Sequence, residues 1–368
     1  MKFLTHLDLS QNHVEGGIPS SIGKLCNLLE VDISSNKLDG TLPEFLQGAH
    51  NCLSSLQFLL EYVDLSSNHF EGPIPCPTNS TLFLDLSNNK FFGPIPSNIG
   101  NSLQVIDLSR NNFSGKIPLS LGQLSDLRIL YLSDNNLSGE IPETFRNLSS
   151  LETLDLGNNR LTGKIPQWIG RGFESLKILN LRSNSFSGAL PSSLSNLSSL
   201  QILDVAGNHG VIPESISNLT QLESLDFSSN RLSGPIPQSL QSISFLQYLN
   251  LSNNNFSGKI PYKDHMTTFE APSYAGNPRL CGPPLVVTCP SDNKDGNSSK
   301  GRTRIDHHDS FVDNWFLLSV GLGFAAGLLV PFLVMAIIKS WGDAYFGLVN
   351  KVFERISLFA YRMRRARP

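Results

Sequence analysis

The sequence predicts a curved solenoid of short stacked repeats with a parallel β-sheet on its concave face, followed by one transmembrane α-helix. Two observations lead to this prediction. A single pattern recurs through residues 1–261, and an uncharged, largely apolar run of 24 residues follows at 315–338. The 29 glycines, 22 prolines and 16% charged residues would suit a disordered chain if they were aperiodic, but a fixed period indicates stacked repeats.

The repeating unit reads L-x-x-L-x-L-x-x-N-x-L-x-G-x-I-P, with clear copies beginning at Leu4, Leu127, Leu151 and Leu246. Its asparagines form a series along the chain: Asn12, Asn36, Asn68, Asn89, Asn111, Asn135, Asn159, Asn184, Asn208, Asn230 and Asn254. Most steps in this series are 21 to 25 residues, which is the spacing of leucine-rich repeats. We therefore expect about 11 repeats, which are mostly β-strand and coil.

Each position of the unit has a physical reason. The L-x-L segment predicts a short strand whose leucines point inward while the residue between them faces outward. The asparagine side chain is expected to turn inward and bond the backbone as the chain leaves the strand. Gly permits the bend that follows, and Pro fixes an extended return segment. No repeat buries its leucines alone, so the stability of the solenoid comes from stacking.

Three irregularities interrupt the pattern. The step from Asn36 to Asn68 is 32 residues, and the later unit "NHGVIP" is two residues shorter than "NNFSGKIP". The chain also opens with "MKFLTHLDLS", in the middle of a repeat, without a signal peptide or an N-terminal cap. We therefore expect the chain to be the C-terminal portion of a longer protein or an incomplete gene product.

The apolar run at 315–338 predicts a membrane-spanning helix. Its 24 residues would extend roughly 36 Å as a helix, against a hydrocarbon core of about 30 Å. Trp315 and Trp341 flank it, where interfacial aromatic residues are expected. Residues 339–368 carry 7 Lys and Arg against 2 Asp and Glu, whereas residues 1–289 carry 17 against 24. This asymmetry predicts a single-pass type I protein with its N-terminus outside the cell and its C-terminus in the cytoplasm. For the run at 315–338, a buried core helix is the alternative to a membrane-spanning helix.

Cysteines indicate how the array ends. Cys281 and Cys289 lie in a Gly/Pro-rich stretch that leaves the repeat pattern, so we expect a C-terminal cap at 262–290 that a disulfide closes. Two unpaired thiols are the alternative. Cys26 and Cys52 occupy nearly equivalent positions on neighbouring turns, which suits a second disulfide. Cys76 is then left over, either buried or paired with a missing segment. A juxtamembrane spacer at 291–314 and a cytoplasmic tail at 339–368 complete the predicted organisation.

Glycosylation sequons are dense, which fits an extracellular surface. The candidate acceptors are Asn79, Asn112, Asn136, Asn147, Asn196, Asn218, Asn255 and Asn297. Asn250 also has the N-x-[ST] form, but it is expected to project from a strand and would place sugar on the concave face. We therefore do not include it.

The order of repeats, "AGNPRLCGPPLVVTC", a hydrophilic spacer, an apolar helix and "KSWGDAYFGLVNKVFERI" resembles plant leucine-rich-repeat receptor-like proteins that lack a kinase domain. The tail is most similar to the type that includes receptors for a fungal ethylene-inducing xylanase. The resemblance implies a plasma-membrane receptor that binds an extracellular protein or peptide ligand, commonly a microbial elicitor in plant defence. It also implies that signalling passes through an adaptor or co-receptor receptor-like kinase.

Small residues in the predicted helix indicate how that kinase is engaged. Ser319, Gly323 and Gly327 recur at four-residue spacing and let a second helix approach closely. The alternative is chance, because Gly is common in membrane helices. In the tail, Tyr345 and Leu348 of "YFGL" have the form of an endocytosis signal in this receptor type. An amphipathic tail at the membrane surface is the alternative.

Five residues are candidate ligand contacts on the concave face, because exposed aromatic and Arg side chains on a rigid curved sheet often bind partners. They are Arg110, Tyr131, Arg160, Arg182 and His209. Ordinary solvated surface is the alternative for each of them. The recurring aspartates belong to the repeat pattern and do not form a catalytic set.

Several function classes receive no support. The sequence contains no nucleophile elbow, phosphate loop, kinase motif set or zinc-ligand array, so we expect no enzyme, no cofactor and no metal. The cluster "DHHD" at 306–309 fits a spacer better than a metal site. A net charge of −3 gives no reason to expect a nucleic-acid partner. The alternative functions are a developmental peptide receptor, a binding module like inhibitors of microbial wall enzymes, and a non-functional truncated product.

Overall fold

The computed structural model describes residues 3–25, 27–42, 60–74, 79–188, 190–207 and 212–289. All of them lie in the first of two units, residues 1–296. Several predictions therefore lie outside the described residues: the span at 315–338 with Ser319, Gly323 and Gly327, the tail with Tyr345 and Leu348, Cys26, Cys52, Cys76, His209 and Asn297. Within the described ranges, no helix is long and apolar enough to cross a membrane.

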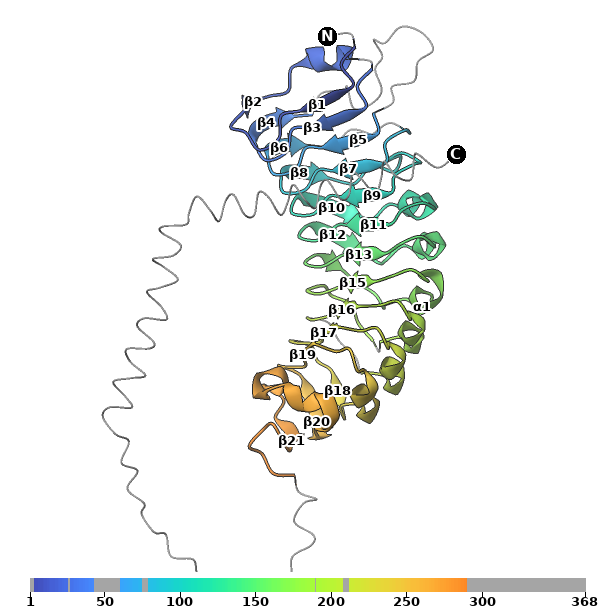
Figure 1. The fold of residues 1–368 in the computed structure, drawn as a ribbon, viewed down its shortest axis with the longest axis vertical. Helices are drawn as coiled ribbons and strands as arrows, with labels where there is room; N and C mark the ends of the chain where they lie inside the picture. The colour runs from blue at the N-terminus through green and yellow to red at the C-terminus, as the bar shows by residue number, and fades with distance from the viewer. Residues whose placement is uncertain are drawn as a thin grey trace, which may run out of the picture. The chain divides into compact units, whose positions relative to one another are not determined.

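Eleven three-residue strands form one parallel sheet, in which each strand pairs with the next one of its kind along the chain (Figure 1). The strands are β1 (His6–Asp8), β3 (Glu30–Asp32), β5 (Tyr62–Asp64), β7 (Phe83–Asp85), β9 (Val105–Asp107), β11 (Ile129–Tyr131), β13 (Thr153–Asp155), β15 (Ile178–Asn180), β16 (Ile202–Asp204), β17 (Ser224–Asp226) and β19 (Tyr248–Asn250). The register never slips, so equivalent repeat positions form columns across the sheet, such as Leu130 beside Leu154. This is the concave sheet that the L-x-L segments predict.

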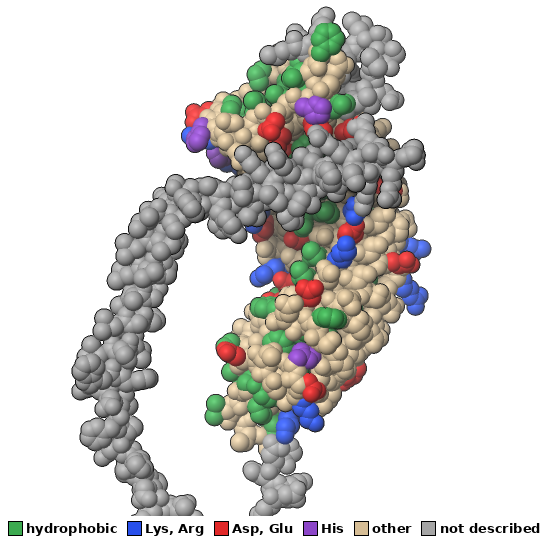
Figure 2. Space-filling view, in the orientation of Figure 1, with side chains coloured by type: hydrophobic (Ala, Val, Ile, Leu, Met, Phe, Trp, Pro, Cys, Tyr) green, Lys and Arg blue, Asp and Glu red, His purple; other side chains and the backbone are tan. Residues whose placement is uncertain are grey.

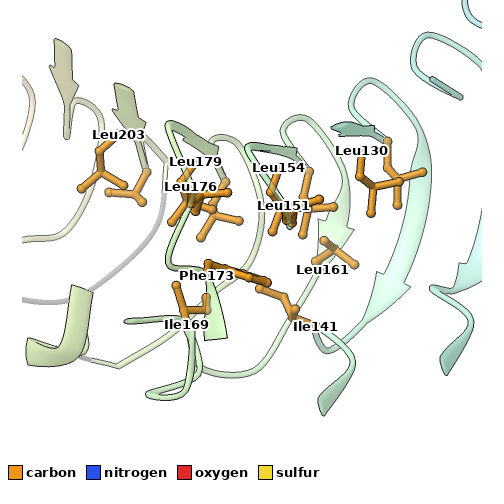
Figure 3. Close-up of a cluster of buried hydrophobic side chains, with 14 of the residues drawn as sticks. Leu130, Ile141, Leu151, Leu154, Leu161, Ile169, Phe173, Leu176, Leu179 and Leu203 are labelled. Atoms are coloured by element: carbon orange, nitrogen blue, oxygen red, sulfur yellow. The ribbon is translucent and has the colours of Figure 1, made fainter. Parts of the chain in front are cut away.

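The middle residue of each strand points into the solenoid, because successive side chains alternate between the two faces of a strand. Leu130, Leu154, Leu179 and Leu203 form one such row, as Figure 3 shows, and each is fully buried. Deeper rows come from the parts of each turn that lie outside the concave sheet, including Phe173 and Leu161 in Figure 3. The core is thus a continuous apolar column that crosses every repeat boundary.

The motif asparagines tie each turn to the turn before it. Asn135 is representative: its Nδ2 donates to the carbonyls of Leu132 and Ser133 in its own turn, at 3.2 and 3.1 Å. The same Nδ2 donates to the carbonyl of Leu108 in the preceding turn at 2.9 Å. Its Oδ1 accepts the backbone N–H of Phe113, also in the preceding turn, at 2.9 Å. One partly buried amide therefore satisfies four backbone groups, which is the inward role that the sequence predicts.

The residue before most motif asparagines adopts a left-handed conformation, although it is rarely Gly. Arg110, for example, has φ 53° and Asp134 has φ 56°. Such angles strain most side chains, so the surrounding bonds must hold them in place. In both turns the backbone N–H bonds a carbonyl of the following turn, that of Ser133 for Arg110 and that of Gly157 for Asp134. The sharp bend is therefore fixed by the stacking itself.

A second line of strands lies beside the concave sheet. Seven of them form one sheet: β2 (Glu15–Gly16), β4 (Lys37–Thr41), β6 (His69–Gly72), β8 (Lys90–Gly93), β10 (Asn112–Lys116), β12 (Asn136–Gly139) and β14 (Arg160–Leu161). Three more form another: β18 (Ser233–Gly234), β20 (Asn255–Lys259) and β21 (Arg279–Cys281). Between the two sheets, the described residues add only one isolated bridge, from Lys164 to Ser187. The shortened unit "NHGVIP" falls in this interval.

Short helices form the remaining side of the solenoid, as Figure 1 shows for the middle turns. They are η1 (Ser20–Lys24), η3 (Leu119–Gln123), η4 (Glu143–Asn147), α1 (Ile169–Gly172), η5 (Ser192–Asn196), η6 (Glu214–Asn218), η7 (Gln238–Ser242), η8 (Asp264–Thr268) and η9 (Ala271–Tyr274). The motif Pro precedes most of them directly and sets the extended backbone from which they start. The turn with α1 contains 25 residues between motif asparagines, one more than the 24 of its neighbours. That extra residue accompanies an α-turn in place of a 3₁₀ turn.

The C-terminal segment corrects one expectation. We expected "AGNPRLCGPP" to leave the repeat pattern, but it forms another turn of the ladder. The Nδ2 of Asn277 donates to the carbonyls of Leu251 and Tyr274 at 3.0 and 2.9 Å, and its Oδ1 accepts the N–H of Phe256. Strand β21 accordingly pairs with β20 in parallel. A disulfide joins Cys281 to Cys289 directly after this strand, with both cysteines buried and their Cα atoms 5.1 Å apart.

Candidate functional site: the concave sheet

Three columns of side chains line the concave sheet because each strand presents the same positions outward. The columns are formed by the first residue of each strand, the third residue of each strand, and the residue just before the strand. In the view of Figure 2, hydrophobic, acidic and basic side chains are interspersed along the solenoid instead of forming one charged patch. The chemistry of the face is therefore best described column by column.

The first column is largely apolar. Tyr62 and Phe83 begin it with stacked rings whose centroids are 4.4 Å apart and whose planes differ by 9°. Val105 and Ile129 continue it in register on β9 and β11. Further along, Ile202 and Tyr248 remain 37% and 49% exposed. Apolar side chains held outward on a rigid sheet are a recognition surface, because a partner that covers them removes them from water.

The second column is acidic. Asp32, Asp64, Asp85 and Asp107 lie side by side on four successive strands, since the register aligns each of them with the next. Each Oδ1 accepts the backbone N–H of the serine two residues later at 2.8 to 3.0 Å. These aspartates therefore cap the bend that follows each strand. This bond is the reason for their recurrence in the repeat.

Crowding changes how these carboxyls titrate. Burial, followed by the neighbouring Asp64 and Asp107 charges, raises the pKa of Asp85 to about 7 against the bonds from Ser87. Burial likewise raises the pKa of Asp64 to about 6, and the Asp32 and Asp107 charges act in the same direction. Burial also raises the pKa of Asp107. Near neutral pH the column is consequently only partly charged.

The third column contains an ion-pair network. Glu152, just before β13, accepts a 2.7 Å bond from the Nε of Arg128 and a second bond from the same guanidinium. Its other oxygen accepts a 2.9 Å bond from the Nζ of Lys177. The hydrogen bond from Lys177, followed by that from Arg128, lowers the pKa of the Glu152 carboxyl. A shallow hollow of about 150 Å³ lies here, lined by Gln104, Val105, Arg128, Ile129 and Glu152.

Three of the five predicted contact residues lie at or beside the concave sheet. Tyr131 ends β11 between Asp107 and Asp155, and burial, then these two carboxylates, raises its pKa. Arg182 follows β15 and its Nη1 lies 3.4 Å from the Oδ2 of Asp204. Arg110 follows β9, well exposed, with its Nε 4.0 Å from Asp134. Both arginines therefore border the sheet and do not project from its strands.

Arg160 requires a correction. We expected it on the concave face, but it is the first residue of β14 in the seven-stranded sheet. It follows the motif asparagine of its turn, after the chain has already left the concave strand. His209 lies outside the described residues. The network of Arg128, Glu152 and Lys177 is missing from the predicted set because its members look like ordinary charged surface unless the strand register is known.

The sequons also separate by position. Asn112, Asn136 and Asn255 begin strands of the second line, and Asn79 is exposed before β7. Asn147, Asn196 and Asn218 each end a short helix. Asn250 lies in the concave sheet, where its Oδ1 accepts the backbone N–H and the Oγ of Ser252 at 3.2 and 2.8 Å. Asn250 therefore takes the bend-capping place that aspartate fills in other repeats.

The described residues offer no metal-binding group of three or more His, Cys, Asp and Glu side chains. The "DHHD" cluster lies beyond the region that the structure covers. The arrangement that remains is a long, ordered face with an apolar column between charged ones.

Comparison with known families matches this reading of the repeats. The family described as Leucine Rich Repeat matches residues 3–25, 27–49, 59–81, 80–101, 102–124, 175–197, 221–243 and 245–263. The family described as Leucine Rich repeats (2 copies) matches residues 125–170. Together these matches cover more than half of the chain.

Curated relatives come from Arabidopsis thaliana. The chain is 38% identical to Receptor-like protein 31 over 71 residues and 36% identical to Receptor-like protein 7 over 74 residues. These stretches are 19% and 20% of this chain, and each spans only 7% of its relative. The relatives are thus far longer than the matched part.

Solved structures share the solenoid over most of its length. The Arabidopsis receptor kinase HAESA, in complex with the peptide hormone IDA and the co-receptor SERK1, is 33% identical with a TM-score of 0.63. That match covers 75% of this chain and 50% of HAESA's. A plant ice-binding protein is 27% identical with a TM-score of 0.59, over 77% of this chain and 83% of its own. The solenoid alone therefore does not select one function. The chain belongs to the leucine-rich-repeat family, and its curated relatives include plant receptor-like proteins.

Proposed function

We propose that this chain is the membrane-anchored part of a plant cell-surface receptor-like protein that binds an extracellular peptide or protein on its concave sheet. The observation that carries the proposal is the outward column of Tyr62, Phe83, Val105 and Ile129, held in register beside the acidic column. A peptide laid along this sheet covers apolar side chains in one column and meets charge in the next. The HAESA ectodomain, with the same fold, is known in complex with a peptide hormone and a co-receptor, which supports this class of ligand and partner.

Signalling in this proposal passes to a receptor-like kinase. In this proposal a partner kinase supplies phosphorylation, as the HAESA complex with the co-receptor SERK1 suggests by analogy. Ser319, Gly323 and Gly327 in the predicted span at 315–338 supply the helix surface for that partner. Tyr345 and Leu348 serve internalisation, and the basic tail lies at the cytoplasmic leaflet. A microbial elicitor is the ligand class that the resemblance to fungal xylanase receptors favours.

The experiment uses the whole chain in plant cells behind an added secretion leader, and first asks whether it reaches the plasma membrane. Cells are then challenged with microbial culture filtrate, and kinases that co-purify with the chain are identified. We expect ligand-dependent recovery of a receptor-like kinase, because the concave sheet and the predicted span act in series. Val105→Arg with Ile129→Arg should abolish the ligand dependence, since two charges replace the centre of the apolar column.

Two controls make the result specific. Leu119 is 63% exposed on the helical side, so Leu119→Arg adds an exposed charge away from the concave sheet and should leave the response intact. Gly323→Leu with Gly327→Leu should keep the chain at the membrane but lose the kinase. Retention of the chain inside the cell, or an unchanged response of the Val105 and Ile129 variant, would contradict the proposal.

A further inference from the structure

A hollow lies on the helical side of the described residues, away from the concave sheet. It has a volume of about 460 Å³ and is formed where α1 meets η5 and η6. Its lining residues are Gln167, Trp168, Arg171, Ser192, Ser193, Ser195, Asn196 and Ser215. That volume is within the range of pockets that take a small molecule, and most of the lining carries hydroxyl, amide or guanidinium groups.

Trp168 breaks a rule that the neighbouring turns obey. The equivalent position holds Thr144, Ser193, Ser215 or Ser239 in other turns, and each hydroxyl donates to a carbonyl of the preceding turn. Trp168 has no such hydroxyl. Its indole ring lies edge-on to the ring of Phe173, with the ring centroids 5.6 Å apart. The indole N–H is buried without an acceptor among the described residues. A large aromatic side chain therefore stands where the repeat requires only a small hydroxyl.

Gly170 allows α1 to pack closely against η5 at this hollow. A Cβ on Gly170 would lie 1.7 Å from the carbonyl oxygen of Ser193, so α1 packs against η5 with backbone touching backbone. Arg171 follows and is exposed, and no ion pair engages it within the described ranges. The helix thus presents an unpaired guanidinium and an aromatic side chain to the same space.

Asn196 completes the hollow and is also a sequon acceptor. It ends η5, is exposed, and lines the hollow with Trp168. Asn147 and Asn218 end η4 and η6 in the same way. In all three sequons the N–H of the next-but-one residue donates to the asparagine carbonyl at 2.9 Å. The three acceptors therefore share one local geometry, but only Asn196 has a tryptophan at its side.

We propose that this hollow is a carbohydrate-binding site whose occupant is the first N-acetylglucosamine of a glycan carried by Asn196. The aromatic ring of Trp168 offers an apolar surface to the C–H groups of the sugar. The guanidinium of Arg171 and the amide of Gln167 offer donors to its hydroxyl and acetyl oxygens. The site is distinct from the concave sheet, and it rests on the proposed function only in requiring that the chain enters the secretory pathway.

The covalent step is ordinary N-glycosylation. The Asn196 amide nitrogen forms a bond to the anomeric carbon of the sugar and loses one proton. The lipid diphosphate that carried the oligosaccharide leaves with the bonding electrons of the broken C–O bond. Asn196 differs from the other sequons in the contact that its attached sugar then makes with the ring of Trp168.

The test compares three sequons in one molecule. The whole chain is expressed in plant cells behind an added secretion leader, so that glycosylation does not depend on where the unmodified chain resides. The folded protein is treated with an amidase that removes entire N-glycans, and release at each site is followed by peptide mass spectrometry. We expect release at Asn196 to be about threefold to tenfold slower than at Asn147 and Asn218, the range that one aromatic contact supports.

The matched variant is Trp168→Ser, which restores the residue type of the neighbouring turns and so preserves the fold. It should bring release at Asn196 to the rate of the other two sites, whereas Trp168→Phe should keep part of the protection. After denaturation, all three sites should release at one rate. Equal release at the three sites in the folded protein, or slow release that persists in Trp168→Ser, would overturn the proposal.

Two further outcomes also decide against it. If Asn196 carries no glycan while Asn147 and Asn218 each carry one, the proposed occupant of the hollow is absent. If free N,N′-diacetylchitobiose then shields Trp168 from oxidation, the hollow takes its saccharide from solution, and the assignment to the attached glycan is wrong. Neither outcome touches the proposed receptor function, whose test measures ligand-dependent recovery of a kinase and not the glycan at Asn196.

Discussion

The concave sheet has two segments that handle charge differently. In the acidic segment, β3 to β9, Asp32, Asp64, Asp85 and Asp107 stand in one row, and no ion pair reaches Asp64 or Asp85 within the described residues. In the ion-paired segment, β11 to β16, Glu152 bonds two cations and Arg182 approaches Asp204. The parallel sheet and the asparagine ladder are the same in the two segments. The difference shows that one repeat template supports two electrostatic surfaces.

Burial raises aspartate pKa values in both segments, including those of Asp155 and Asp204, but the shift is largest for Asp64 and Asp85 of the acidic segment. A carboxylate that is half-buried beside others loses hydration and gains repulsion, so it holds its proton to higher pH. In the ion-paired segment, Arg128 and Lys177 compensate Glu152, which stays charged. We therefore expect the acidic segment to respond to pH in the physiological range and the network to respond to salt.

The largest expected effect tests whether the framework is shared. Asn89→Ala in the acidic segment and Asn159→Ala in the ion-paired segment each remove the same four bonds. Each should destabilise its turn by about 2 to 4 kcal/mol, because buried backbone groups are left without partners. Hydrogen exchange of the adjacent strands measures the loss. A large difference between the two variants would mean that the segments do not rest on equivalent ladders.

The next effect is the pH response of the acidic segment. The folded-state pKa values of Asp64 and Asp85, about 6 and about 7, lie above the ordinary value of 3.8. The folded state then binds more protons than the unfolded state, so stability rises as pH falls from about 8 towards 4. The gain is on the order of a few kcal/mol, and protection of β5 and β7 at pH 8, 6.5 and 5, corrected for intrinsic exchange, measures it.

Asp85→Asn separates this cause from others. The amide resembles the protonated acid, so the variant should be more stable than the parent at pH 8 and about equal to it at pH 5. Two results would show that the ionised Asp85 carboxylate does not destabilise the folded state. One is protection of β7 that falls towards pH 5, and the other is a variant that is less stable than the parent at pH 8.

The smallest effect concerns the network of the ion-paired segment. Glu152→Gln removes its central charge and should cost about 0.2 to 1 kcal/mol, because the partners are partly exposed. The carboxyl pKa is lowered, so its contribution is present at neutral pH and is lost as the pH falls through the folded-state pKa, which lies below the ordinary value of a glutamate carboxyl. Unfolding at low and high salt checks it, since added salt should shrink the difference. A salt-independent loss would indicate lost packing instead.

Residue patterns predict the framework well because the framework is local. The L-x-L strands, the inward asparagines and the left-handed bends all follow from the unit itself. The sequence pattern missed Asn277 because its turn has Tyr274 where the unit has leucine, and because Leu280 and Gly282 each come one residue later than in the unit. Arg160 was misplaced because one residue beyond the motif asparagine the chain already belongs to another sheet.

The site was less predictable because it depends on register between turns. Burial raises the pKa values of Asp64 and Asp85 most, and carboxylates 21 or more residues away in sequence add to the shift. Arg128, Glu152 and Lys177 meet only when three strands align. Trp168 is visible as an aromatic residue where the turns on either side of it have Thr144 and Ser193, but only after the turns are superimposed. Periodicity predicts the columns, whereas function depends on which residues depart from them.

The most direct test of the receptor account places a photo-crosslinking amino acid on the whole chain at the surface of plant cells. One variant carries it at Ile129, in the apolar column of the concave sheet, and the other at Leu119, on the helical side. After treatment with microbial filtrate, the account predicts that Ile129 crosslinks to an extracellular peptide or protein and that an excess of unlabelled filtrate competes with it, while Leu119 does not. Equal crosslinking at both positions, or none at Ile129 when a kinase is nonetheless recruited, would contradict ligand binding on the concave sheet.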